Sequence, residues 1–206
     1  ISSPVVFNPD TYEMKARITR NLNYCYGEDV ILDGSNSDPH NRHSWEIWDA
    51  SNGWENRILL DAINQFENPG FPATANGSAN LSDHFSFEAG KCYTIILVTK
   101  KFCDGVLTNA TPDIVQVCIN TSPGPYAPIN YVIPCDEDCI EIGETPQDPG
   151  QTITADWNDG HTGFTRTVCS ETTTPYVVTF TNQFGCTATQ EITVEKDDCC
   201  LDPCFE

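Results

Sequence analysis

The sequence is poor in basic residues and in long apolar runs. Only 10 of its 206 residues are Lys or Arg, against 30 Asp or Glu, which gives a formal net charge of −20. A chain this acidic repels phosphate groups, which excludes nucleic acid and anionic membrane surfaces as main partners. No run approaches the ~18–20 apolar residues of a membrane-spanning helix, so no membrane span is predicted. Residues 1–4 lack the charged and apolar segments of a signal peptide, and we expect the sequence to begin at a mature N-terminus after export.

Cysteine, in contrast, is abundant. Eleven cysteines in a chain of this size are typical of a disulfide-bonded protein from an oxidising compartment, so we expect a secreted, extracellular or cell-surface location. Because the number is odd, at least one thiol is unpaired or bonded to another chain. All eleven are disulfide candidates: Cys25, Cys92, Cys103, Cys118, Cys135, Cys139, Cys169, Cys186, Cys199, Cys200 and Cys204.

Metal binding is the alternative for two of the polar clusters. The cysteines of the second half could supply thiolates for zinc, but they lack the two-residue spacing of a zinc knuckle and no His lies close to them. Residues 33–38 alternate oxygen-bearing side chains as calcium loops do, with Asp33 and Asp38 as the candidate ligands. This segment lacks the distal Glu of an EF-hand loop. We therefore expect disulfides, a structural turn and no cofactor, with calcium as the weaker alternative.

Proline and glycine mark a boundary near the middle of the chain. Residues 121–130 hold three Pro and one Gly, a composition that predicts an extended linker. Residues 1–121 carry 15 acidic and 8 basic side chains, whereas residues 122–206 carry 15 and 2. The predicted parts are an N-terminal arm (1–12), a first β-domain (13–121), a linker (122–134), a second β-domain (135–198) and a Cys-rich C-terminal tail (199–206).

Alternating apolar and polar residues predict short strands in both halves. In one segment, residues 55–66, the apolar side chains instead recur on one helical face, which predicts a short amphipathic helix. Turn signals recur about every ten residues, as in β-sandwiches. The predicted fold is therefore all-β, with two tandem sandwiches and a short helical insertion in the first. The predicted strands cover residues 12–19, 30–32, 44–48, 91–98, 113–118, 151–157, 176–181 and 191–194.

Two motifs of the first half resemble those of a known family. Residues 25–37 read CYGEDVILDGSNS and residues 87–97 read FEAGKCYTIIL. Both resemble PKD-type immunoglobulin-like domains, which have an Asp-Gly-Ser-x-Ser turn and a later Tyr-Thr-x-x-Leu strand. The resemblance spans residues 25–118. It departs from the family at residues 45–50, where WEIWDA replaces Trp-x-Phe-Gly-Asp-Gly, so the domain is PKD-like rather than a standard member.

The second half is similar to the short immunoglobulin-like repeats of the same class of protein. Its residues 157–160 read WNDG, residues 174–182 read TPYVVTFTN and residues 185–189 read GCTAT. The class comprises secreted surface proteins of gliding, Bacteroidetes-type bacteria. These motifs specify turns and strands and carry no catalytic group, so the resemblance implies β-sandwiches and no enzymatic activity.

The predicted immunoglobulin-like sandwich also favours one disulfide pairing in the first half. Cys25, Cys92, Cys103 and Cys118 allow three pairings. Cys25 and Cys92 each begin a strand, and we expect those strands to lie side by side in opposite sheets. Cys25–Cys92 is therefore the favoured bridge, and Cys103–Cys118 follows by subtraction.

Exposed aromatic residues and glycosylation sequons are candidate surface features. Trp48 and Trp54 could stack on sugar rings and make the chain a carbohydrate- or surface-binding module, with surface glycans or other surface proteins as partners. The pattern Asn-x-Ser/Thr occurs four times in expected loops or strand ends. The four acceptor residues are Asn76, Asn80, Asn109 and Asn120.

The N-terminal arm suggests self-assembly. Its apolar residues, Ile1, Val5, Val6 and Phe7, form a strand-like segment before the first predicted strand. Such an arm can add to the sheet edge of a neighbour. We therefore predict a non-enzymatic structural subunit of an extracellular bacterial filament, sheath or adhesive appendage. The adhesin or carbohydrate-binding module described above is the alternative.

Overall fold

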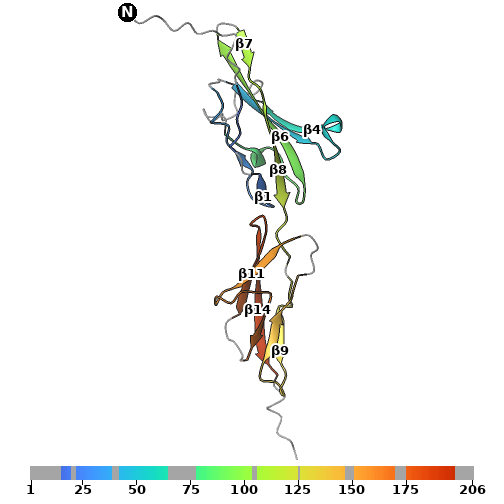
Figure 1. Cartoon of the computed structure of the whole chain (residues 1–206). Coiled ribbons are helices and arrows are strands. Elements are labelled where there is room, and N and C mark those ends of the chain that lie inside the picture. The colour runs from blue at the N-terminus through green and yellow to red at the C-terminus, as the bar shows by residue number, and fades with distance from the viewer. Residues whose placement is uncertain are drawn as a thin grey trace, which may run out of the picture. The chain divides into compact units, whose positions relative to one another are not determined.

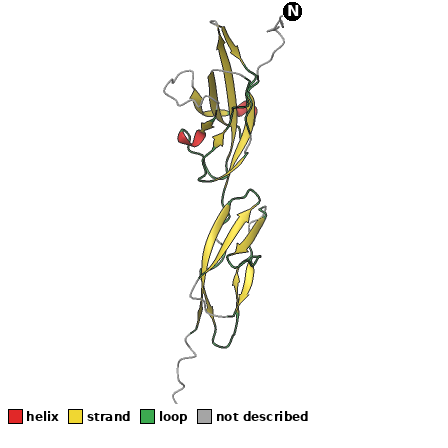
Figure 2. Cartoon of the chain, turned by 90° about the vertical axis from the view of Figure 1, so that its left-hand side faces the viewer, coloured by secondary structure: helices red, strands yellow, loops and turns green. Residues whose placement is uncertain are grey.

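The computed structural model describes residues 15–19, 22–38, 42–64, 78–103, 106–124, 126–146, 151–169 and 175–197. The chain divides into two compact units, residues 1–120 and 121–206. Apart from two single-turn 3-10 helices, every regular element of the described part is a strand, which confirms the all-β prediction (Figures 1 and 2). No helix among these residues is long and apolar enough to cross a membrane.

The first unit contains a large sheet and a small one. The 3-10 turns η2 (Trp54–Asn56) and η3 (Leu81–Asp83) lie beside them. The small sheet pairs β2 (Ile31–Leu32) with β5 (Ala79–Asn80). The large sheet has the order β1 (Asn23–Cys25), β8 (Asp113–Asn120), β6 (Cys92–Cys103), β3 (Arg42–Asp49) and β4 (Ile58–Asn64), with β7 (Val106–Asn109) also paired to β6.

Strand alternation gives the first unit one core between its two sheets. Trp45 and Ile47 of β3 point inward, as do Ile95 and Leu97 of β6, and all four are almost fully buried. Leu32 of the small sheet packs into the same cluster. The side chains between the inward ones point to the outer face, as a period of two requires. The unit is thus built from two packed layers.

The predicted helix over residues 55–66 is wrong. Of these residues the structure describes 55–64, and it places there the short turn η2 and then strand β4, which pairs with β3. The register shifts between Ile47 and Trp48 of β3, so Leu60 of β4 has no partner opposite it. A bulge of this kind inserts one residue and breaks the period of two. The broken period is what resembled a helical face in the sequence.

The second unit repeats the plan of one larger and one smaller sheet. Its core contains Trp157, Val178, Phe180 and Ile192, each at most 4% exposed. The small sheet pairs β10 (Ile140–Gly143) with β12 (Thr165–Val168). The larger sheet has the order β11 (Ile153–Trp157), β13 (Tyr176–Asn182), β14 (Thr187–Lys196) and β9 (Asn130–Ile133).

The proline-rich segment is part of the second unit. Strand β9 lies inside the range predicted as a linker, residues 122–134, and it pairs with β14. Its last residue, Ile133, is 1% exposed and belongs to the core of that unit. Proline is compatible with this position because β9 is an edge strand and the prolines precede it.

The disulfides differ from the favoured pairing. Cys92 bonds to Cys118 and Cys139 bonds to Cys169, so Cys25–Cys92 and Cys103–Cys118 are both wrong. The reason is that the strands of Cys25 and Cys92, β1 and β6, lie in the same sheet with β8 between them. Cys92 is directly opposite Cys118 on the neighbouring strand. The other described cysteine side chains, Cys25, Cys135 and Cys186, are disulfide-bonded as well.

Candidate interaction surface on the first unit

Strand β4 forms an exposed apolar edge of the first unit. It is the last strand of the large sheet, and β3 is its only partner among the described residues. The side chains of Ile58, Leu59 and Leu60 are 60%, 46% and 39% exposed. Three successive exposed aliphatic residues on an edge strand are unusual, because unpaired N–H and C=O groups beside apolar side chains invite another chain to pair.

The end of the β3–β4 hairpin carries a stack of aromatic and guanidinium groups. The hairpin projects from the rest of the first unit (Figure 1). The guanidinium of Arg57 lies 4.0 Å from the ring centre of Trp54 and 5.1 Å from that of Trp48. The Trp48 indole N–H also donates to Glu46 Oε2 at 3.0 Å. Arg57 therefore lies over one face of each of these two rings.

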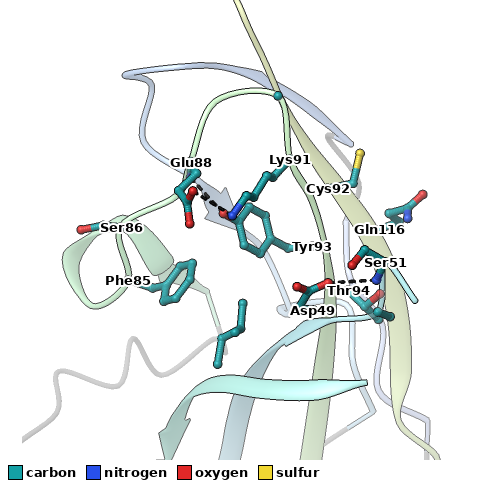
Figure 3. A pocket seen from close by; sticks show the side chains of 13 residues that line it. Asp49, Ser51, Phe85, Ser86, Glu88, Lys91, Cys92, Tyr93, Thr94 and Gln116 are labelled. Carbon is teal, nitrogen blue, oxygen red and sulfur yellow. Dashed lines mark hydrogen bonds and ion pairs between the residues drawn. The ribbon is translucent and has the colours of Figure 1, made fainter. Parts of the chain in front are cut away.

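A cavity of about 500 Å³ opens beside the end of β3 and the turn that follows it (Figure 3). Leu60, Phe85 and Tyr93 supply apolar surface, and Asp49 and Glu88 supply carboxylates. The Tyr93 ring makes an edge-on contact with Phe85, with 5.5 Å between ring centres. The cavity thus adjoins β4 and continues the hairpin surface toward the start of β6.

The charged groups of the cavity are already paired. The Lys91 ammonium lies 2.8 Å from Glu88 Oε2, and this hydrogen bond raises the pKa of Lys91 (Figure 3). Asp49 Oδ1 accepts the N–H of Ser51 at 2.9 Å. Hydrogen bonds from the Ser51 side chain and backbone hold the pKa of Asp49 below its usual value. The Lys91–Glu88 pair is exposed to solvent, with 54% and 65% of the two side chains accessible.

The candidate calcium ligands act as turn acceptors. Asp33 accepts hydrogen bonds from the hydroxyl of Ser78 at 2.6 Å and from the N–H of Ser35 at 2.8 Å, and these bonds lower its pKa. Asp38 Oδ2 accepts the N–H of Lys15 at 2.8 Å. Among the described residues, no three His, Cys, Asp or Glu side chains gather as metal ligands would. The segment is a polar turn that ties residues 15–19 to the small sheet.

Two of the four sequon residues use their side-chain amides inside the fold. The Asn80 carbonyl caps η3 by accepting the N–H of Ser82 at 3.1 Å. The Asn120 amide donates to Tyr24 O and Cys118 O, at 3.3 and 3.4 Å. A glycan on Asn120 would leave only one side-chain N–H to make these bonds. Asn76 and the side chain of Asn109 lie outside the described residues, so their prediction stays untested.

The remaining predicted sites also fall outside the described part of the chain. These are the arm residues Ile1, Val5, Val6 and Phe7, the side chain of Cys103, and Cys199, Cys200 and Cys204. The sequence does not predict the apolar edge of β4, because the spacing of its apolar residues favours a helix. The one signal of this edge in the sequence is the run Ile58-Leu59-Leu60, because a strand buried on one face alternates apolar and polar residues and has no run of three apolar ones.

Comparison with known proteins adds no relative: no family model matches the chain, and no curated protein matches it significantly.

Proposed function

We propose that this chain is a secreted structural subunit that self-associates into an extracellular filament, sheath or adhesive appendage. The observation that carries the proposal is the exposed apolar edge of β4, with Ile58, Leu59 and Leu60. Its occupant is the N-terminal arm of a second copy. Both units are immunoglobulin-like, the first PKD-like, and disulfides are compatible with the oxidising environment outside the cell.

The arm and the edge are both short and apolar. Pro4 and Pro9 bracket residues 5–8 of the arm, and because Pro lacks a backbone donor the segment able to pair is short. The bulge at Leu60 likewise limits how long a strand can add to β4. Val5, Val6 and Phe7 would cover the aliphatic side chains of the edge, and the backbone groups of both segments would be paired.

The first test is to delete residues 1–10 and to substitute Leu59 by Lys, because charged residues on an edge strand prevent pairing. Both variants should remain folded and monomeric at concentrations at which the native chain assembles. Light scattering coupled to size-exclusion chromatography measures the mass, and circular dichroism measures the fold.

A matched control is available on the same sheet. Ile114 is 49% exposed, close to the 46% of Leu59, but it lies in β8, an inner strand of the sheet between β1 and β6. The Ile114→Lys variant should therefore assemble normally. A native chain that stays monomeric at high concentration, with and without reductant, would refute the proposal. Retention of that monomer on a polysaccharide column, lost in Trp54→Ala, would support the binding-module alternative instead.

A further inference from the structure

In the second unit, the first strand pairs in parallel with the last. β9 lies beside β14 at the edge of the larger sheet, and four residue pairs hold them in register. Hydrogen bonds extend both ends of this ladder: Thr193 N–H donates to Ile129 O at 2.8 Å and Asp197 N–H donates to Ile133 O at 3.0 Å. The chain therefore enters and leaves this unit along two neighbouring strands that run in the same direction.

The contact begins before β9 itself. The Asn182 side-chain amide donates to Thr121 O at 3.0 Å. The Gln190 side chain hydrogen-bonds with both the O and the N–H of Ala127. Asn182 and Gln190 are each only 6% exposed, so the entering chain satisfies two buried amides that would be costly to leave unpaired. The proline-rich segment is thus fastened along the sheet and is not a free linker.

The first unit has the same arrangement. β1 pairs in parallel with β8, the last strand, through three residue pairs. Cys118 N–H donates to Leu22 O and Tyr26 N–H donates to Asn120 O, each at 2.9 Å. A further parallel bridge joins Lys15 to the residues just before β8. Two units with different sheets therefore share one feature, a parallel pair formed by their terminal strands.

Pulling on the ends of such a unit loads the parallel pair in shear. The start of the first strand and the end of the last strand are drawn in opposite directions along the strand axis. Because the slanted hydrogen bonds of a parallel pair are evenly spaced, they share the load and must break together. If the two strands were pulled apart from one end, the bonds would break one at a time. The joint breaking of the bonds in shear is the free-energy barrier to unfolding, and the rate of crossing it sets the force that the unit withstands.

We propose that both units are tension-bearing modules whose mechanical resistance resides in the β1–β8 and β9–β14 pairs. The load would pass from one unit to the next through the fastened proline-rich segment. This function goes beyond self-association and does not depend on the N-terminal arm, because a monomeric chain would have it too.

Two disulfides join other strands of the same units. The Cys92–Cys118 bond joins β8 to β6, so the strand that receives β1 is covalently held to its other neighbour. Cys139 and Cys169 lie at the end of the β10–β12 ladder and join those strands. Neither bond links the two strands of a parallel pair. The resistance of the pairs themselves can therefore be measured with both bonds intact.

Single-molecule force spectroscopy on the full chain tests the proposal by changing only the direction of pulling. In the second unit, handles at Ile129 and Asp197 load the β9–β14 pair in shear, and handles at Asp136 and Asp197 peel it from one end. All three residues are exposed. Cys135→Ser and Cys186→Ser are present in both samples, so that the two directions of pulling are compared on the same hydrogen bonds of the pair. Circular dichroism confirms the fold of each labelled chain.

The rupture force at equal loading rate should be severalfold higher in shear than in peeling. Equal forces, or a higher force in peeling, would overturn the proposal, because the hydrogen bonds are the same in both samples. The first unit provides a second measurement should the cysteine variant of the second unit fail to fold. There, handles at Leu22 and Thr121 give shear and handles at Tyr26 and Thr121 give peeling, with Cys25→Ser in both. An assembled state is not needed, so this result is independent of the test of self-association.

Discussion

Gly143, at the end of β10, occupies a position that only glycine can fill. Its φ is +92°, and a Cβ atom there would lie 2.1 Å from the backbone oxygen of Phe164. Its N–H also donates to the hydroxyl of Tyr131 at 3.0 Å, while β10 pairs with β12 through the same residue. The placement of the Tyr131 side chain, the backbone turn at the end of β10 and the register of the small sheet therefore all depend on Gly143.

Gly143→Ala should lower the free energy of unfolding by about 3 kcal/mol or more, combining the cost of a left-handed backbone with that of overpacking against a main chain. The control is Gly160→Ala: φ is +88° there, but nothing lies within 4 Å of the added Cβ. That variant should lose only about 1–2 kcal/mol. Urea unfolding followed by Trp fluorescence measures both. If both variants lost the same free energy of unfolding, the backbone at Phe164 would be able to move away from the added Cβ without an energetic cost.

At the scale of single elements, the sequence predicts strands well wherever apolar and polar residues alternate and the apolar ones all pack into one core. Val178 and Phe180 of β13 and Trp45 and Ile47 of β3 are buried as their spacing requires. The prediction fails at β4, where the bulge and the exposed edge place apolar side chains on both faces. Local periodicity reports burial on one face only, so it cannot identify a strand that carries apolar side chains on both faces.

The disulfides and the parallel pairs show a second limit. The pairing of Cys92 with Cys118 follows from β6 and β8 being neighbours, and the parallel pairs follow from which strands come first and last in each sheet. Strand order depends on contacts between residues about 95 positions apart, as between Asn23 and Cys118. Composition and local spacing carry no information on that order. The prolines of residues 121–130 therefore predict a linker, although the segment leads into β9, which pairs with β14.

Removing the Cys92–Cys118 bond should destabilise the first unit by about 2–4 kcal/mol, because the bond closes a loop and limits the unfolded chain. The double variant Cys92→Ser/Cys118→Ser leaves no new free thiol. The matched change is Cys139→Ser/Cys169→Ser, because the sequence separations, 26 and 30 residues, are similar. It should destabilise the second unit by a similar amount. Calorimetry resolves the two units, and an unchanged melting temperature in either variant would contradict the prediction.

For the whole molecule, charge opposes the proposed assembly. The chain carries a net charge of −20, and both halves are acidic, so every copy repels every other. The proposed contact between the arm and β4 is apolar and gains nothing from long-range attraction. Assembly must therefore draw on the burial of aliphatic residues, while the charge sets how closely subunits can approach at a given ionic strength.

Added salt should therefore promote assembly. Raising the ionic strength from 0.01 to 0.1 M shortens the Debye length from about 30 Å to about 10 Å, which screens the repulsion between acidic copies and leaves the apolar contact unchanged. Static light scattering at fixed protein concentration should show a larger mean mass at the higher ionic strength. The variant lacking residues 1–10 should stay monomeric in both, which separates arm-dependent assembly from general salting-out. A mean mass that falls with salt would show that opposite charges hold the subunits together, and the apolar arm would then not be the contact that drives assembly.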